Sequence, residues 1–255
     1  MVNVSATIPD KRIEQVGYLT GVLLLASGLL HLAILLTSGR SWEGPLSWRK
    51  PMTFGLSFGL TLITIVWVAS FMRLRARTRT IVLGAFTAAA ALETALITMQ
   101  TWRGVPSHFN VETPFDAWVT RGLAGGGVAL VILVVTLTIA AYRTPIDPLP
   151  GMKVAIRTGF LILCGAMATG AIMIARGMML VFEGDAAAAY TTGGALKPTH
   201  AVTMHAILVL PALAWLLSRT SWSEERQRKY IRVASAGYAL LAVIVAVANI
   251  AVTAR

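Results

Sequence analysis

Two histidines stand in the opening turns of an apolar stretch that is long enough to cross a membrane. The stretch runs from Lys197 to Leu217, KPTHAVTMHAILVLPALAWLL, and holds His200 and His205. An ionisable side chain inside a bilayer costs about 3 kcal/mol or more unless it is paired or lines a cavity, so it marks a candidate functional site. Imidazole is a common ligand of haem iron and suits zinc and copper. The two histidines are therefore candidate ligands of haem or of a transition metal.

Other costly side chains lie near the same ends of the other apolar segments. Residues five apart on a helix point about 140° away from each other, so His31 and His205 are the expected metal ligands rather than His200 with His205. Arginines would bind acidic groups of the cofactor, such as haem propionates. A carboxyl at Glu93 should be neutral or paired with a cation such as Arg121 or Arg176. The cofactor-binding candidates are His31, His200, His205, Arg49, Arg121 and Arg176, and the catalytic candidates are Glu93, Gln100, Arg103 and His108.

The alternative is that each histidine only forms a hydrogen bond with a neighbouring residue or with water.

Composition indicates an integral membrane protein: 56% of the 255 residues are hydrophobic and only 13% are charged, with a mean hydropathy of +0.71. A soluble domain of this length needs more charge to cover its surface. The net charge of +11 fits basic residues beside membrane spans, so no nucleic-acid partner is expected. A single Cys164 cannot form an internal disulfide.

Seven apolar segments predict an all-α fold, a polytopic transmembrane bundle of seven helices that forms one domain over residues 1 to 255. Each segment approaches the roughly 20 residues that span about 30 Å of hydrocarbon. The polar residues 1 to 15 precede a first span that we expect to be uncleaved. The segments are residues 16–37, 52–72, 81–102, 116–141, 154–179, 200–218 and 231–252.

Basic residues predict the orientation of these helices. The second, fourth and sixth connections hold most of the basic residues, including Arg73, Arg75, Arg77 and Arg79, and the positive-inside rule places them in the cytoplasm. The N-terminus is then cytoplasmic and the C-terminus lies outside. The candidate site residues fall near the other face, which predicts an outer-leaflet polar pocket. We expect a multi-pass protein of the bacterial cytoplasmic membrane.

Local patterns add three expectations. Gly17, Gly21 and Gly28 on the first segment, with Gly55 and Gly59 on the second, predict closely packed helix faces. Thr113 with Asp116 resembles a capping box and predicts the start of the fourth helix. The connection 180–199 is either a mobile cover over the site or a plain surface loop.

Three resemblances bear on function. The residues Ser47, Trp48, Arg49, Lys50, Pro51, Phe54, Gly55 and Ser57, with Gln100, Arg103, Gly104, Ser107, His108, Phe109 and Asn110, resemble a set of bacterial polytopic membrane proteins and imply no activity. The run Gln100, Arg103, Gly104, His108 is similar to haem A synthase helices, although the paired glutamates and multiple histidines of that family are missing. Ser27 with His31 resembles the S-x-x-x-H motif of seven-helix zinc amidases, but the family's H-x-x-x-H becomes H-x-x-x-x-H here, and its aspartate is not evident.

Three functional classes remain open. The first is a haem- or metal-dependent membrane oxidoreductase, whose partner would be a quinone or another membrane redox protein. The second is a transporter or receptor that binds an anionic small molecule through Arg121 and Arg176; an odd helix count without visible self-similarity argues against it. The third is a zinc hydrolase or a structural accessory protein. The lipid bilayer is a partner in each case, and a homo-oligomer is compatible with all three.

Overall fold

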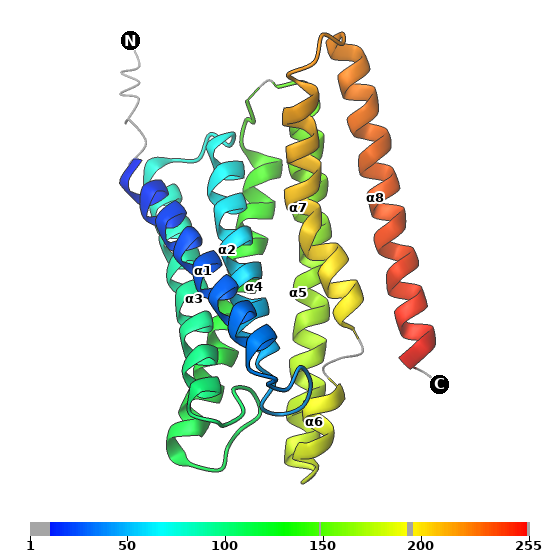
Figure 1. Cartoon of the computed structure of the whole chain (residues 1–255). Coiled ribbons are helices and arrows are strands. Elements are labelled where there is room, and N and C mark those ends of the chain that lie inside the picture. Colours follow the sequence, from blue (N-terminus) through cyan, green and yellow to red (C-terminus); the bar gives the residue numbers. More distant parts are fainter. Residues whose placement is uncertain (1–10, 148, 193–195, 254–255) are drawn as a thin grey trace.

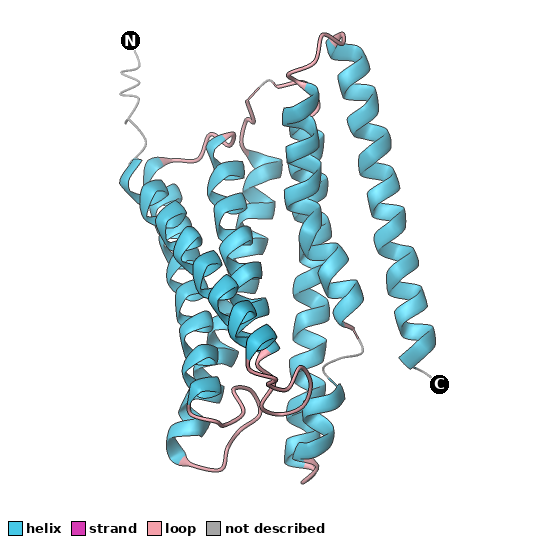
Figure 2. Ribbon diagram, in the orientation of Figure 1, coloured by secondary structure: helices cyan, strands magenta, loops and turns pink. Residues whose placement is uncertain are grey.

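The computed structural model describes residues 11–147, 149–192 and 196–253, and these residues form helices and loops without any strand (Figures 1 and 2). The polar segment before Lys11 lies outside the described residues. The helices are α1 (Lys11–Thr37), α2 (Arg49–Ser70), α3 (Ala76–Trp102), α4 (Pro114–Arg143), α5 (Met152–Phe182), α6 (Ala186–Thr192), α7 (Lys197–Leu217) and α8 (Glu224–Thr253).

Seven of the eight helices in the described residues are long and apolar enough to cross a membrane, and α6 is a short extra helix. The architecture is that of a multi-pass membrane protein, as predicted. The long helices alternate in direction (Figure 1). One end, which we call the α6 end, holds the connections 38–48, 103–113 and 183–196. The opposite, basic end holds the connections 71–75, 144–151 and 218–223. Which end faces the cytoplasm stays a prediction from charge.

Every long helix begins before the apolar segment that predicted it, whereas α2 and α7 end one or two residues earlier than predicted. The largest difference is α8, which begins at Glu224 rather than near residue 231. Its polar first turns contain an ion pair between Arg228 and Glu224, with 2.8 Å between nitrogen and oxygen, and pairs four residues apart stabilise a helix. Hydropathy detects the part of a helix that lies in hydrocarbon, whereas polar turns continue past it.

Glycines join α1 and α2 at backbone contact, as the sequence predicted. Gly17, Gly21 and Gly28 are buried on one face of α1. A Cβ atom added at Gly28 would lie 2.6 Å from the backbone nitrogen of Leu56, and one added at Gly55 would lie 2.7 Å from the backbone nitrogen of Gly28. Residues without side chains let two helices approach this closely in lipid, where packing drives helix association.

A second close pair is formed by α5 and α7. A Cβ atom added at Gly159 of α5 would lie 2.9 Å from the Cα atom of Ile207. The bundle therefore has two groups of helices, α1–α3 on the left of Figure 1 and α5, α7 and α8 on the right. Helix α4, which carries three consecutive glycines at 125–127, contacts both α3 and α5. Direct contact between α2 and α7 is sparse.

Candidate functional site

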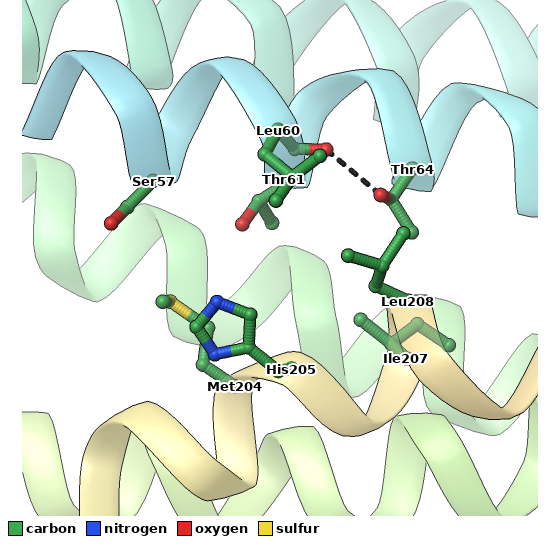
Figure 3. A pocket seen from close by; sticks show the side chains of 8 residues that line it. All are labelled: Ser57, Leu60, Thr61, Thr64, Met204, His205, Ile207 and Leu208. Carbon is green, nitrogen blue, oxygen red and sulfur yellow. Dashed lines mark hydrogen bonds between the residues drawn. The ribbon is translucent and has the colours of Figure 1, made fainter. Parts of the chain in front are cut away.

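A narrow cleft separates α2 from α7 within the membrane-length part of the bundle (Figure 3). Its cavity volume is about 10 Å³, which is about the space that one water molecule needs. Three hydroxyl side chains of α2 line it together with a histidine and apolar residues. Because steps of three and four residues return to one helix face, the hydroxyls form a stripe along α2. The lining residues are Ser57, Leu60, Thr61, Thr64, Met204, His205, Ile207 and Leu208.

The imidazole of His205 projects from α7 into this cleft, toward Ser57 and Thr61 (Figure 3). Its Nδ1 lies 2.6 Å from the carbonyl oxygen of Ala201. Because a carbonyl only accepts, Nδ1 carries a proton, and no described residue forms a hydrogen bond with Nε2. The contact fixes the ring while Nε2 remains open to a further partner.

His200 is held in the same way but against another helix. Its Nδ1 lies 2.8 Å from the carbonyl oxygen of Ala166 in α5 and 3.3 Å from the hydroxyl of Thr169. The two histidines of α7 therefore serve different interfaces, as their spacing predicted: His205 faces α2, and His200 faces α5.

Positive charge gathers at the end of the α2–α7 interface where both helices begin, which we call the cleft mouth. Arg49 and Lys50 open α2, and Lys197 opens α7. The charge on Lys50 interacts with the charges on Arg49 and Lys197, and the charge on Lys197 interacts with that on Arg49. The acidic group that interacts with all three is Glu43, whose carboxylate lies 3.8 Å from the Arg49 guanidinium and whose side chain is 71% exposed. One exposed carboxylate leaves the three cations with an excess of positive charge.

The connection between α3 and α4 covers this mouth. The His108 ring packs against Phe54, with 5.9 Å between ring centroids. Burial and the nearby positive charge of Lys50 lower the pKa of His108 to about 3, so the ring is neutral at physiological pH. Phe109 adopts a φ of 64° and places its ring against Gly177 of α5. This unusual backbone conformation for a bulky residue anchors the connection to the second group of helices.

Gln100 and Arg103, two catalytic candidates, belong to a network at the start of α4. Gln100 Nε2 donates to Asp116 Oδ1 at 2.8 Å, and Arg103 Nη1 donates to the same oxygen at 2.7 Å and to Gln100 Oε1. Thr113 caps α4, accepting from the Asp116 backbone N–H at 3.1 Å, which confirms the predicted helix start. The network joins α3 to α4, and the polar side chains of Gln100 and Arg103 are bonded to each other and to Asp116.

His31 occupies an aromatic cluster. Its Nδ1 donates to the Ser27 carbonyl at 2.7 Å, and its Nε2 accepts from the indole N–H of Trp102 at 3.0 Å. The Trp48 ring centroid lies 6.4 Å away. Both ring nitrogens are thus occupied, and His31 would have to lose the Trp102 bond before its Nε2 could ligate a metal.

Glu93 is buried between α3 and α4, at 4% exposure. Its Oε1 has no hydrogen-bond partner among the described residues and occupies the space where a Cβ atom of Gly126 would stand. The predicted pairing with Arg121 or Arg176 is not found, since no ion pair of Glu93 occurs in the part of the chain that the structure describes. The missing side chain at Gly126 is what makes room for this carboxyl.

The two arginines proposed to bind an anion lie apart. Arg121 is exposed and has its guanidinium 5.5 Å from the ring centroid of Trp118, itself 70% exposed. Arg176 lines a mainly apolar groove between α5, α7 and α8, with a cavity volume of about 350 Å³. Neither points into the α2–α7 cleft. Arg49 alone of the predicted cofactor-binding arginines lies at the cleft mouth.

Most candidate residues thus lie in the half of the bundle nearer the α6 end, Glu93 lies close to mid-helix, and they do not line a single pocket. His31, Glu93 and the Gln100–Arg103 pair are separate sites, and only His205, with Arg49 and His108 at the mouth, belongs to the cleft. Within the described residues, no three His, Cys, Asp or Glu side chains group closely enough to hold a metal ion. The prediction missed the cleft hydroxyls Ser57, Thr61 and Thr64, whose spacings of four and three residues on α2 place them on one helix face. It also gave no role to Lys50 and Lys197, the two Lys-Pro lysines at the starts of α2 and α7.

Comparison of the chain with protein-family models, with curated proteins and with solved structures finds no match in any of the three.

Proposed function

We propose that this protein is a membrane transporter whose small-molecule pathway is the cleft between α2 and α7. The observation that carries the proposal is the hydroxyl-lined face of α2 opposite His205, inside two membrane-length helices that barely pack on each other. Polar side chains at membrane depth mark substrate and ion pathways. Here they line a cavity of about 10 Å³ between two helices that share few contacts.

The arrangement of the two helix groups supports alternating access. Backbone contacts at glycines make α1–α2 and α5–α7 rigid pairs, whereas few contacts hold α2 to α7. Transporters of this kind rock one rigid group against another around a binding site near the midplane. A cavity of about 10 Å³ admits a ligand only when the two walls separate, so the structure corresponds to a closed state of the proposed cycle.

Charge supports a location in the bacterial cytoplasmic membrane. By the positive-inside rule, the basic end faces the cytoplasm and the α6 end faces outward. The cleft mouth would then open to the outside.

Thiol accessibility tests the pathway. In a Cys164→Ser background, which leaves no other thiol, Ser57→Cys and Thr61→Cys should react with a membrane-impermeant methanethiosulfonate reagent applied to intact spheroplasts. Leu29→Cys, on the exposed face of α1 at 57% exposure, is the matched control, because lipid covers it and it should not react. If Ser57→Cys and Thr61→Cys stay as unreactive as Leu29→Cys from both sides of the membrane, the cleft is dry and the transporter proposal fails.

Haem or metal ligation is a second candidate function. His200 and His205 both anchor Nδ1 on a backbone carbonyl, and no described residue bonds their Nε2. Metal-binding histidines are oriented in this way by a second hydrogen bond. The absorption spectrum of the purified protein, with elemental analysis, tests this function. Absence of both a Soret band and stoichiometric metal would exclude it, whereas a signal lost in His205→Ala would establish it.

A further inference from the structure

The two groups of helices pack in the same order. In the first group α1 packs most closely on α2, followed by α2 on α3 and then α1 on α3. In the second group α5 packs most closely on α7, followed by α7 on α8 and then α5 on α8. Helix α4 stands between them. Matching the helices in chain order pairs α1 with α5, α2 with α7 and α3 with α8, and each pair runs in one direction (Figure 1).

The residues of α2 and α7 correspond at one constant offset in residue number. That offset carries Lys50–Pro51 onto Lys197–Pro198, at the first turns of the two helices. It also relates three cleft-lining residues of α2 to three of α7, whereas Thr64 and His205 have no cleft-lining counterpart. Ser57, Leu60 and Thr61 become Met204, Ile207 and Leu208, all six of which line the cleft.

The glycine contacts obey the same correspondence. A Cβ atom added at Gly21 would lie 3.1 Å from the carbonyl oxygen of Gly59, and one added at Gly159 would lie 3.2 Å from the carbonyl oxygen of Ala206. Gly59 and Ala206 are related by the offset that relates the two Lys-Pro pairs. The helix pairs α1–α2 and α5–α7 are therefore structural equivalents, an arrangement of parallel repeats that transporters use to build a binding site at the interface of the halves.

We propose that Lys50 and Lys197 are the equivalent halves of one binding site for an oxyanion, a carboxylate or phosphate group, at the cleft mouth. The site rests on the proposed function and names its substrate class as anionic. Both lysines begin a helix, where the helix dipole disfavours a cation. They share the cleft mouth with Arg49, and the carboxylate that interacts with all three cations is the exposed Glu43.

The surroundings of Lys50 favour recognition over a solvated surface charge. Its ammonium lies 5.9 Å from the ring centroid of Tyr190 in α6, beneath the connection that carries His108. The Arg49 guanidinium is 16% exposed, and its buried Nε has no hydrogen-bond partner in the described residues. An oxyanion held by the two lysines would relieve the repulsion among the three cations, and Ser57 lies about 10 Å farther along α2 from Lys50.

Ligand-induced thermal stabilisation of the purified full chain tests the site, with succinate, inorganic phosphate and phosphatidylglycerol as separate probes. We expect one probe to raise the melting temperature in a saturable way. Lys50→Gln and Lys197→Gln should each weaken its apparent affinity about tenfold or more, because each removes a charge-assisted contact. Lys50→Arg should retain binding. Lys153→Gln, an exposed cation at the opposite end, is the control and should leave the affinity unchanged.

The outcomes separate the site from the transporter proposal. A soluble probe sensitive to both lysines supports an anionic solute, and a response to phosphatidylglycerol alone assigns the oxyanion to a lipid headgroup. Loss of affinity in only one of the two variants, or no response to any probe, overturns the two-lysine site. Removing a lysine relieves repulsion, so neither variant should melt below the parent without ligand. If Ser57→Cys still reacts with the impermeant thiol reagent while no anion binds, the pathway stands and only its substrate class is wrong.

Discussion

Replacing Asp116 by Asn should destabilise the protein through the network that joins α3 to α4. The carboxylate is 3% exposed and accepts from Gln100, Arg103 and the Thr113 hydroxyl at 2.8, 2.7 and 2.6 Å. A hydrogen bond to a charged acceptor contributes about 1.5–3 kcal/mol, against about 1 kcal/mol for a neutral one. The Arg103 side chain is 39% exposed, so solvent screens its share.

These contributions add to an expected loss of about 2–3 kcal/mol in the free energy of unfolding. The measurement is reversible unfolding in mixed micelles with increasing sodium dodecyl sulfate, followed by circular dichroism. Thr113→Ala removes the helix cap and one of the three hydrogen bonds to the carboxylate, but it leaves those from Gln100 and Arg103, and it should cost about 1–2 kcal/mol. Arg121→Gln is the control on the exposed surface and should change the free energy by less than about 0.5 kcal/mol.

The comparison between Asp116→Asn and Arg121→Gln tests whether the Asp116 carboxylate holds α3 and α4 together. If both variants unfold within about 0.5 kcal/mol of the parent protein, the carboxylate does not organise the start of α4, and the contacts of Gln100 and Arg103 with it do not hold the two helices together. If Arg121→Gln is the more damaging change, the assignment of that arginine to an exposed position is wrong.

Three further predictions concern packing and pH. Gly28→Ala should cost about 1–3 kcal/mol by overpacking, since its Cβ would lie 2.6 Å from an α2 backbone nitrogen. Gly125→Ala is the control, because open space surrounds it, and it should be neutral or stabilising by up to about 1 kcal/mol. The same denaturation assay measures both variants. Gly126→Ala should displace the Glu93 carboxyl and lower the melting temperature, and the loss should disappear in a Glu93→Ala background. Burial and a nearby lysine lower the pKa of His108 from 6.5 to about 3, so the unfolded chain binds more protons than the folded chain between these two pH values. The free energy of unfolding should therefore fall by up to about 1.4 kcal/mol per pH unit as pH drops from 6.5 to 3. A pH series of melts measures this slope, and His108→Gln should remove its share.

The membrane-length helices, the buried glycine faces of α1 and α2 and the cap at Thr113 were predictable because each depends on residues close in sequence. The short helix α6 also had a local signal, since Asp185 accepts from the Ala188 backbone N–H at 2.9 Å ahead of a run of alanines. The first turns of α8 were missed because they are polar, and a hydropathy pattern detects only the apolar part of a helix.

The grouping of the polar residues was not predictable, because in lipid the outer surface of a bundle is as apolar as its interior. Sequence therefore placed Arg121 and Arg176 toward the same end of their helices but could not say that one lies against Trp118 on the surface and the other in a groove. His31 and His205 looked alike until Trp102 was seen to bond the first. The proposed equivalence of the pairs α1–α2 and α5–α7 was also not predictable, because the cleft-lining residues that correspond in position, such as Ser57 and Met204, differ in chemistry.

The three glycines in the middle of α4 have a mechanical consequence. This helix is the only membrane-length segment between the two groups in chain order, so any rocking of one group against the other bends or twists it. Glycine in a helix interior lowers the resistance to bending, which concentrates the deformation at residues 125–127. Glu93 lies directly against Gly126, so bending of α4 at these glycines would move the surroundings of its carboxyl, although Glu93 does not line the cleft.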